Sequence, residues 1–277
     1  MPTWNEVADG VFQRRYDPLD VSVCVVRGAG GLLLVDTRSS HREADEIRAD
    51  LRVFGDLAVR WVVNTHAHFD HSFGNARFGP GSDIDAPIHG HRRVPAHLAE
   101  YERPMLDDWI ARRVEPVADW REVVITPPGV LVDEHMTLDL GDRGADLLHL
   151  GRGHTDNDLL VHVPDADTWL AGDLVEESGP PMYGSGSFPL EWPGTVAALA
   201  RRLGPDTTVV PGHGAPVSRA FVVDQQARLR QVAEVISDLH AAGVPVDDAL
   251  AQGGGRWPFP EDGLATAVAD AYRHLDG

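Results

Sequence analysis

The chain has 277 residues, of which 43% are apolar and 24% are charged, and its formal net charge is −19. This composition is ordinary for a soluble globular protein, and the acidic balance argues against nucleic acid as a partner, because a polyanion requires a basic surface. The single cysteine, Cys24, excludes an intrachain disulfide. No apolar run approaches the length of a membrane span, and the first residues lack the basic and apolar regions of a secretory signal, so we expect a cytoplasmic protein without membrane attachment.

The first quarter of the chain alternates patterns typical of strands and helices. Strands are expected at the apolar runs 21–26, 32–35 and 57–63. The first two runs are separated by a glycine-rich turn typical of a hairpin. Between the second and the third, Ser40 and Glu43 have the spacing of a capping box, which predicts that a helix begins there and ends at Gly55.

The rest of the chain contains a helical segment and then further strands. Residues from about 91 to 128 are rich in Arg, Glu and Trp and are expected to form a helical cover near the site. Strands are expected at residues 86–89, 138–140, 145–150, 159–163, 169–171 and 207–210, and helices at 195–203, after Ser218 and at the C-terminus. No linker divides the chain, so the sequence predicts a single domain over residues 1–277, an α/β fold with helices packed outside stacked sheets.

One stretch concentrates side chains that can bind a metal. His66, His68, Asp70 and His71 follow directly after the strand expected at 57–63. Where a strand ends, side chains of either parity can converge on one point, which a regular strand forbids. Neutral imidazole nitrogens and carboxylate oxygens are ligands that zinc takes from proteins. A polar loop with surface histidines is the alternative, but three histidines and one aspartate within six residues favour a metal site.

Three later segments share a second pattern. In each, an apolar strand is followed by a glycine-flanked turn that carries one further ligand, which is His154, Asp173 or His213. Glycine at a strand end lets the backbone approach closely and adopt positive φ, which helps to aim one side chain into a shared site. Each turn alone has an ordinary explanation. Together with the first cluster they supply seven ligands, enough for two ions that share one carboxylate.

In these motifs the chain resembles the metallo-β-lactamase superfamily of hydrolases. The resemblance rests on His66-Ala67-His68-Phe69-Asp70-His71, Gly153-His154-Thr155, Gly172-Asp173 and Gly212-His213-Gly214, which occur in the family's order, and on Asp36, which matches an early aspartate at a strand end. It implies an αββα sandwich of two mixed sheets flanked by helices. It also implies one ion on His66, His68 and His154, a second ion on Asp70, His71 and His213, and Asp173 as the bridge between them.

The resemblance also narrows the activity. The β-lactamases proper often carry Cys or Ser in place of Asp173, so this chain looks more like the thioesterase, lactonase and general hydrolase branches. Asp36 is expected to orient a ligand or the cluster loop from behind. Two zinc ions per chain are expected, although iron or manganese also suits such ligands.

The chemistry that follows is metal-assisted hydrolysis. Two ions that share a water lower its pKa from 15.7 towards about 7, which gives a hydroxide that attacks a carbonyl carbon. Asp70 is the expected catalytic residue, because it can orient that hydroxide. The sequence thus predicts a zinc-dependent hydrolase of a carbonyl ester, lactone or thioester. The alternatives are a cyclase or thioesterase of a biosynthetic pathway, a β-lactamase-like amidase and an iron-dependent persulfide dioxygenase.

The expected partner is a small-molecule substrate with an apolar body. Several aromatic and methionine side chains lie in segments expected to border the site. Those expected to line a substrate pocket are Met105, Trp109, Met182, Tyr183, Phe188 and Trp192. Pockets for small molecules are mostly apolar with a few placed polar groups.

Overall fold

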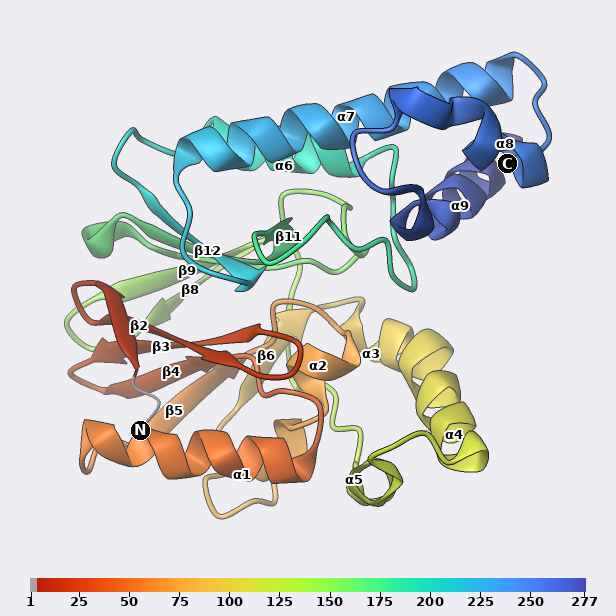
Figure 1. The fold of residues 1–277 in the computed structure, drawn as a ribbon. Coiled ribbons are helices and arrows are strands. Elements are labelled where there is room, and N and C mark those ends of the chain that lie inside the picture. The colour runs from red at the N-terminus through yellow and green to blue at the C-terminus, as the bar shows by residue number, and fades with distance from the viewer. Residues whose placement is uncertain (1–3) are drawn as a thin grey trace.

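A computed structural model describes residues 4–277, in which two β-sheets lie face to face between outer layers of helices (Figure 1). The strands of the N-terminal half are β1 (Asn5–Ala8), β2 (Val11–Tyr16), β3 (Val21–Gly28), β4 (Gly31–Val35), β5 (Val59–Val63), β6 (Ile88–His91) and β7 (Val130–Val132). Those of the C-terminal half are β8 (His135–Asp139), β9 (Gly144–Leu148), β10 (Leu160–Val163), β11 (Thr168–Glu176) and β12 (Thr208–His213). The expected αββα architecture is confirmed.

The first sheet has the strand order β1-β2-β3-β4-β5-β6-β7, and its strands run parallel from β4 to β7. Helix α1 (His41–Asp50) covers its outer face (Figure 1). The Ser40 side chain accepts a hydrogen bond from the Glu43 N–H, as the capping box predicts, and the Glu43 carboxylate accepts one from the Ser39 N–H. A short 3₁₀ turn extends the helix to Gly55, which adopts φ +69 and ends it.

Strict alternation along β3 and β4 separates two cores. One set of side chains packs with α1 on the outer face, namely Val23, Val25, Leu32 and Leu34. The other set, Cys24, Val26, Leu33 and Val35, packs between the sheets against the second sheet. This period of two is what a strand buried on both faces requires. Cys24 is accordingly a buried thiol in the layer between the sheets.

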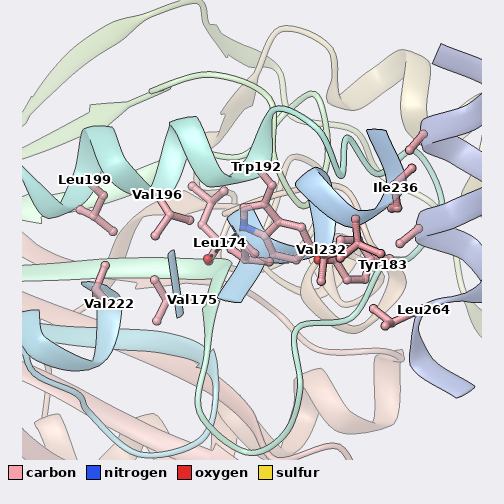
Figure 2. Packing of buried hydrophobic residues seen from close by; sticks show 14 of the residues in the cluster. Leu174, Val175, Tyr183, Trp192, Val196, Leu199, Val222, Val232, Ile236 and Leu264 are labelled. Carbon is pink, nitrogen blue, oxygen red and sulfur yellow. Dashed lines mark hydrogen bonds between the residues drawn. The ribbon is translucent and has the colours of Figure 1, made fainter. Parts of the chain in front are cut away.

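The second sheet has the strand order β8-β9-β10-β11-β12 and is antiparallel except for the parallel pair β11–β12. Helices α6 (Trp192–Ala200) and α7 (Arg219–Ala241) cover its outer face (Figure 1). Figure 2 shows the packing there, where Val196 and Leu199 of α6 are fully buried above β11. Burial of one such aliphatic side chain contributes about 1.5–3 kcal/mol to folding.

The two sheets are joined edge to edge through one registered residue pair, His213 of β12 with Val21 of β3. The strands of this region also correct the sequence analysis, because β11 continues to Glu176 and β12 to His213. Asp173 and His213 therefore lie within strands and not in turns beyond them. The register of β11 against β12 shifts on both sides of Gly172, which adopts φ +53. These irregularities supply the local freedom that the turns were expected to supply.

The covering segment lies beside the first sheet. It comprises α3 (Val94–His97), a π-helical turn at Leu98–Glu102, α4 (Arg103–Arg112) and α5 (Val117–Glu122). It packs on the short helix α2 (Phe69–Ser72) through Trp109, whose ring centroid lies 5.0 Å from that of Phe69.

The C-terminal region forms α8 (Val246–Gly253), which the sequence analysis did not predict, and α9 (Ala265–Asp276). Among the helices of residues 4–277, none combines the length and the apolar character that crossing a membrane requires.

Candidate metal centre

The seven predicted ligands meet at one edge of the two sheets. Four of them come from the segment that follows β5 and begins α2, and the others come from the segment after β9, from β11 and from β12. Donor atoms of His66, His68 and His154 form one group within 4.8 Å of one another, and those of Asp70, His71 and His213 form a second. The structure thus brings together the residues that the sequence motifs single out, in the grouping that the resemblance implies.

The distances in the second group are those of ligands around a small cation, whereas the three rings of the first group lie slightly closer together. His68 Nδ1 lies 3.2 Å from His66 Nε2 and 2.8 Å from His154 Nε2. In the other group, His213 Nε2 lies 3.4 Å from both His71 Nε2 and Asp70 Oδ2. A tetrahedral zinc site with bonds of about 2.0–2.2 Å has edges of about 3.3–3.6 Å between ligands.

Asp173 lies between the two groups. Its Oδ2 is 3.4 Å from His154 Nε2 and 3.3 Å from His213 Nε2, and its Oδ1 is 3.2 Å from His71 Nε2. A Cβ atom on Gly212 would overlap Asp173 Oδ1, so glycine is required there for the carboxylate to reach this position. The geometry therefore suits a carboxylate shared between two sites.

The hydrogen bonds behind the histidines fix which nitrogen of each ring carries a proton. The outer nitrogens of three rings face main-chain carbonyl oxygens, His68 Nε2 at Ser185 (3.0 Å), His154 Nδ1 at Met182 (3.0 Å) and His213 Nδ1 at Leu19 (2.7 Å). A carbonyl oxygen only accepts, so each outer nitrogen must donate. The inner nitrogen of each ring then presents its lone pair to the centre of the site.

The other two histidines are oriented by Asp36. His71 Nδ1 donates to Asp36 Oδ2 at 2.8 Å. The Thr65 hydroxyl also donates to Asp36 Oδ2, at 2.7 Å, and can therefore accept from His66 Nδ1 at 3.1 Å. In their neutral forms all five rings would turn lone pairs inward, at distances where lone pairs repel unless a proton or a metal cation lies between them. Asp173 Oδ1, a buried oxygen without a hydrogen-bond donor, belongs to the same set. This donor set fits metal ions.

Asp36 holds the ligand loop at a cost in backbone conformation. It directly follows β4, is 1% exposed and adopts φ +66, a conformation that non-glycine residues rarely adopt. Besides the two side-chain hydrogen bonds above, its Oδ1 accepts from the Thr65 main-chain N–H at 2.8 Å. The position expected for Asp36, behind the ligands, is the one observed.

Burial and charge divide the metal-free site into neutral imidazoles, cationic imidazoles and anionic carboxylates. Burial alone would lower the pKa of His71 and His213, but the neighbouring carboxylates, Asp173 foremost, outweigh it and raise the pKa of both, so these two rings carry a second proton until a metal replaces it. Burial lowers the pKa of His66 and His68 and lowers that of His154 to about 3, which keeps these imidazoles neutral and able to bind metal. Burial alone would raise the pKa of Asp173, but the surrounding histidines, His71 foremost, outweigh it and hold that pKa well below its ordinary value. Asp173 is therefore an anion, which suits a carboxylate shared between two metal sites.

A pocket of about 420 Å³ opens beside these ligands. Its wall includes Leu19, Phe69, Met105, Met182 and Ser185, together with ligands from both groups. Of the residues expected to line a pocket, the structure thus places Met105 and Met182 there. Three residues of the wall also orient histidines. The main-chain carbonyl oxygens of Leu19, Met182 and Ser185 accept hydrogen bonds from His213, His154 and His68, respectively.

The other residues expected in the pocket lie elsewhere. Tyr183 and Trp192 are 3% and 0% exposed and belong to the core under α6 and α7 (Figure 2). Trp109 packs among aromatic rings of the covering segment. Phe188 stacks on His274 of α9, with ring centroids 5.0 Å apart. Residue type alone does not separate a core aromatic side chain from one in a pocket wall.

Two buried acidic residues of the pocket wall were missed from the sequence. Glu102 is 1% exposed and Glu176 is 6% exposed. Burial, followed by the charge of Asp173, raises the pKa of Glu176 to about 8. The position of Glu176, three residues after Asp173, is the one signal that could have found it. Glu102 lies in a helical segment without any motif.

Solved structures define the class of fold. The chain aligns with a metallo-β-lactamase from Pontibacter korlensis at a TM-score of 0.65 and 18% identity, over 82% of this chain and 98% of that one. It aligns with a double mutant of the sec-alkyl sulfatase PisA1 at a TM-score of 0.75 and 16% identity, over 99% of this chain and 50% of that one. At such identities these likenesses show the αββα fold alone.

Sequence comparison defines the family. The profile of the Metallo-beta-lactamase superfamily matches residues 16–213, and the chain belongs to this superfamily. It is 26% identical over 187 residues to the acyl-coenzyme A thioesterase MBLAC2 of Bos taurus, which covers 61% of this chain and 64% of that protein. It is 24% identical over 204 residues to the metallo-β-lactamase type 2 of Bacillus cereus, over 72% of this chain and 69% of that protein. The match thus spans slightly less than two thirds of the thioesterase.

Proposed function

We propose that this chain is a zinc-dependent hydrolase of a carbonyl ester, lactone or thioester of a small substrate with an apolar body. One observation supports the zinc site above others. Five histidines, each with its outer nitrogen hydrogen-bonded, direct their inner nitrogens toward a site that holds a buried carboxylate.

The residues divide between two zinc sites. The first ion would be held by His66, His68 and His154, the second by Asp70, His71 and His213, and Asp173 would be shared between them. When bound, the pair supplies Lewis acidity and lowers the pKa of a shared water towards about 7.

Asp70 has a further role in the proposal. Burial alone would raise its pKa, but His71 and His213 outweigh that effect and lower it, so Asp70 is an acceptor. It lines the pocket, where its carboxylate can hold the proton of the attacking water and fix its orientation.

The pocket wall supports an uncharged or cationic substrate. Its exposed surface is mostly apolar, and no arginine lies among the pocket-lining residues of the described chain, which contains no lysine. A β-lactam antibiotic carries a carboxylate and a phosphodiester carries a phosphate, and neither would find an arginine or lysine side chain there. The acyl-coenzyme A thioesterase relatives at 26% and 27% identity favour a thioester within the proposed class.

The test compares substrate classes at constant metal loading. Protein from metal-replete medium is analysed for its elements, and kcat/KM is measured for an aryl ester, a lactone, a thioester, a chromogenic β-lactam and a bis-aryl phosphate. We expect up to two zinc ions per chain and preference for the first three substrates. His154→Gln should lose metal and activity, whereas His135→Gln, at an exposed histidine on β8, should retain both.

Two results would contradict the proposal. A clear preference for the phosphodiester or the β-lactam would overturn the substrate class. Iron as the dominant metal, with oxygen uptake during turnover, would overturn hydrolysis in favour of the dioxygenase alternative.

A further inference from the structure

The carboxylate of Glu102 is an unusual feature of the pocket wall. The other carboxylates there are Asp70 and Asp173, which belong to the metal ligands, and Glu176, which accepts from the Met182 N–H at 3.2 Å. Glu102 is 1% exposed and lines the pocket from the end of the π-helical turn. Its Oε2 is buried without a hydrogen-bond donor, and such an oxygen in a native fold calls for a missing partner.

The other oxygen of Glu102 is already engaged. Oε1 accepts from the Ser185 hydroxyl at 3.2 Å, and His97 Nε2 lies 3.6 Å from it. These contacts fix the carboxylate against the segment that covers the site, and they leave Oε2 as the free acceptor. At 3.6 Å the His97 ring is beyond hydrogen-bond distance, and its Nε2 is also buried without a hydrogen-bond partner.

A third metal ion is the first alternative, because donor atoms of His68, His97 and Glu102 lie within 4.8 Å of one another. The hydrogen bonds exclude it. The Ala67 main-chain N–H donates to Asn157 Oδ1 at 2.9 Å, which fixes the orientation of that amide. Asn157 Nδ2 therefore donates to His97 Nδ1 at 3.1 Å, and in the neutral ring His97 Nε2 must carry the proton.

The same reasoning applies to the second histidine of this group. His68 Nε2 donates to the Ser185 carbonyl oxygen, so it has no lone pair for another metal. Two of the three candidate donors are thus N–H groups. Oε2 is therefore an acceptor without a donor on a residue that lines the pocket.

We propose that Glu102 determines specificity by accepting a hydrogen bond, through Oε2, from a hydroxyl, amide N–H or ammonium group of the substrate. The inference rests on the proposed function for the reaction and adds the class of substrate, which is an apolar carbonyl compound with one hydrogen-bond donor away from the scissile bond. A substrate with a carboxylate in that position is rejected, because two anions would meet in a buried site.

The experiment uses four thiophenyl esters of phenylacetic acid that differ only in the para substituent. The substituents are methyl, hydroxymethyl, aminomethyl and carboxyl, none of which can cyclise onto the thioester. Four ketones, in which a methylene replaces the sulfur, serve as non-hydrolysable ligands whose binding is measured by calorimetry. The zinc-loaded full chain is compared with Glu102→Gln and with Glu100→Gln, which changes an exposed glutamate on the same turn.

Wild-type protein should bind the hydroxymethyl and aminomethyl ketones about ten- to hundredfold more tightly than the methyl ketone, and the carboxyl ketone most weakly. The kcat/KM values of the thioesters should follow the same order. Glu102→Gln keeps an acceptor oxygen but loses the charge, so the aminomethyl preference should be lost and the hydroxymethyl preference retained in part. Glu100→Gln should behave as wild type.

The two proposals fail separately. Equal binding of the methyl, hydroxymethyl and aminomethyl ketones by wild-type protein overturns the role of Glu102, even if all four thioesters are hydrolysed. An unchanged order of affinities in Glu102→Gln also overturns it. The expected binding order without hydrolysis of any thioester leaves the recognition site standing and overturns the proposed reaction.

Discussion

Replacing Asp36 by asparagine changes one atom behind the proposed second metal and should weaken metal binding. In the native chain this carboxylate accepts three hydrogen bonds, from the Thr65 N–H, the Thr65 hydroxyl and His71 Nδ1. An asparagine side chain has one oxygen and one NH₂ group. Its NH₂ group, itself a donor, must therefore point at one of these donors. The main-chain N–H of Thr65 can only donate, which directs the amide oxygen to it and the NH₂ group to His71.

The cost follows from the His71 ring. To accept from the amide, His71 must move its proton from Nδ1 to Nε2, the nitrogen that faces Asp70, Asp173 and His213. The ring then cannot bind a metal without breaking that new hydrogen bond. A hydrogen bond to a charged group contributes about 1.5–3 kcal/mol, so we expect roughly ten- to hundredfold weaker binding of the second ion.

The assay is equilibrium dialysis against a series of zinc buffers, followed by elemental analysis. At a free zinc concentration that saturates wild-type protein, Asp36→Asn should bind less metal per chain. Asp45→Asn, at a carboxylate on the exposed side of α1 that pairs with Arg77, removes the same charge and should bind as wild type. Equal zinc affinity of Asp36→Asn and wild type would refute the role of Asp36 in orienting His71.

Three further changes test other parts of the site. Asp173→Ala should lose at least one ion and most activity while keeping a native circular dichroism spectrum, and an unfolded variant would make Asp173 mainly structural. In Gly212→Ala the new methyl group displaces Asp173 and should give the same metal loss, whereas Gly144→Ala, where the nearest atom to a Cβ is 3.6 Å away, should not. In metal-free protein the pKa of Glu176 is about 8, whereas in the unfolded chain it is about 4.5. Between these pH values only the folded state keeps the proton, so the free energy of unfolding falls as the pH rises. Glu176→Gln should therefore gain stability over wild type from pH 5 to pH 8.5, on the order of a few kcal/mol in denaturant titrations, and parallel curves would contradict the buried proton.

The sequence could single out the residues that meet at this edge of the sheets because their signal is local. Four of these residues, His66, His68, Asp70 and His71, lie within six positions of the sequence. The two later histidines, His154 and His213, are each next to glycine in the sequence. The period of two along β3 and β4 likewise appears in the residue order, since both faces of those strands are buried. Patterns of this kind depend only on residues that are close in sequence.

The pocket wall could not be predicted in this way. Glu102 reaches the site only because the covering segment folds back over it, and its partner Ser185 lies far along the chain. Tyr183 and Met182 are adjacent, yet one is in the core and the other is 67% exposed at the pocket. Which of two neighbouring side chains faces the substrate depends on how the loop packs against α6 and α7, and this is a tertiary property.

The main-chain carbonyls of Leu19, Met182 and Ser185 orient three histidines of the proposed metal site, and the same three residues form part of the pocket wall. A carbonyl oxygen is present whatever the side chain, so a substitution at these positions changes the wall but leaves the acceptor in place. We expect natural or directed evolution to find new substrates here at little cost in zinc affinity. A scaffold that orients its ligands through the backbone leaves those side chains free to diversify.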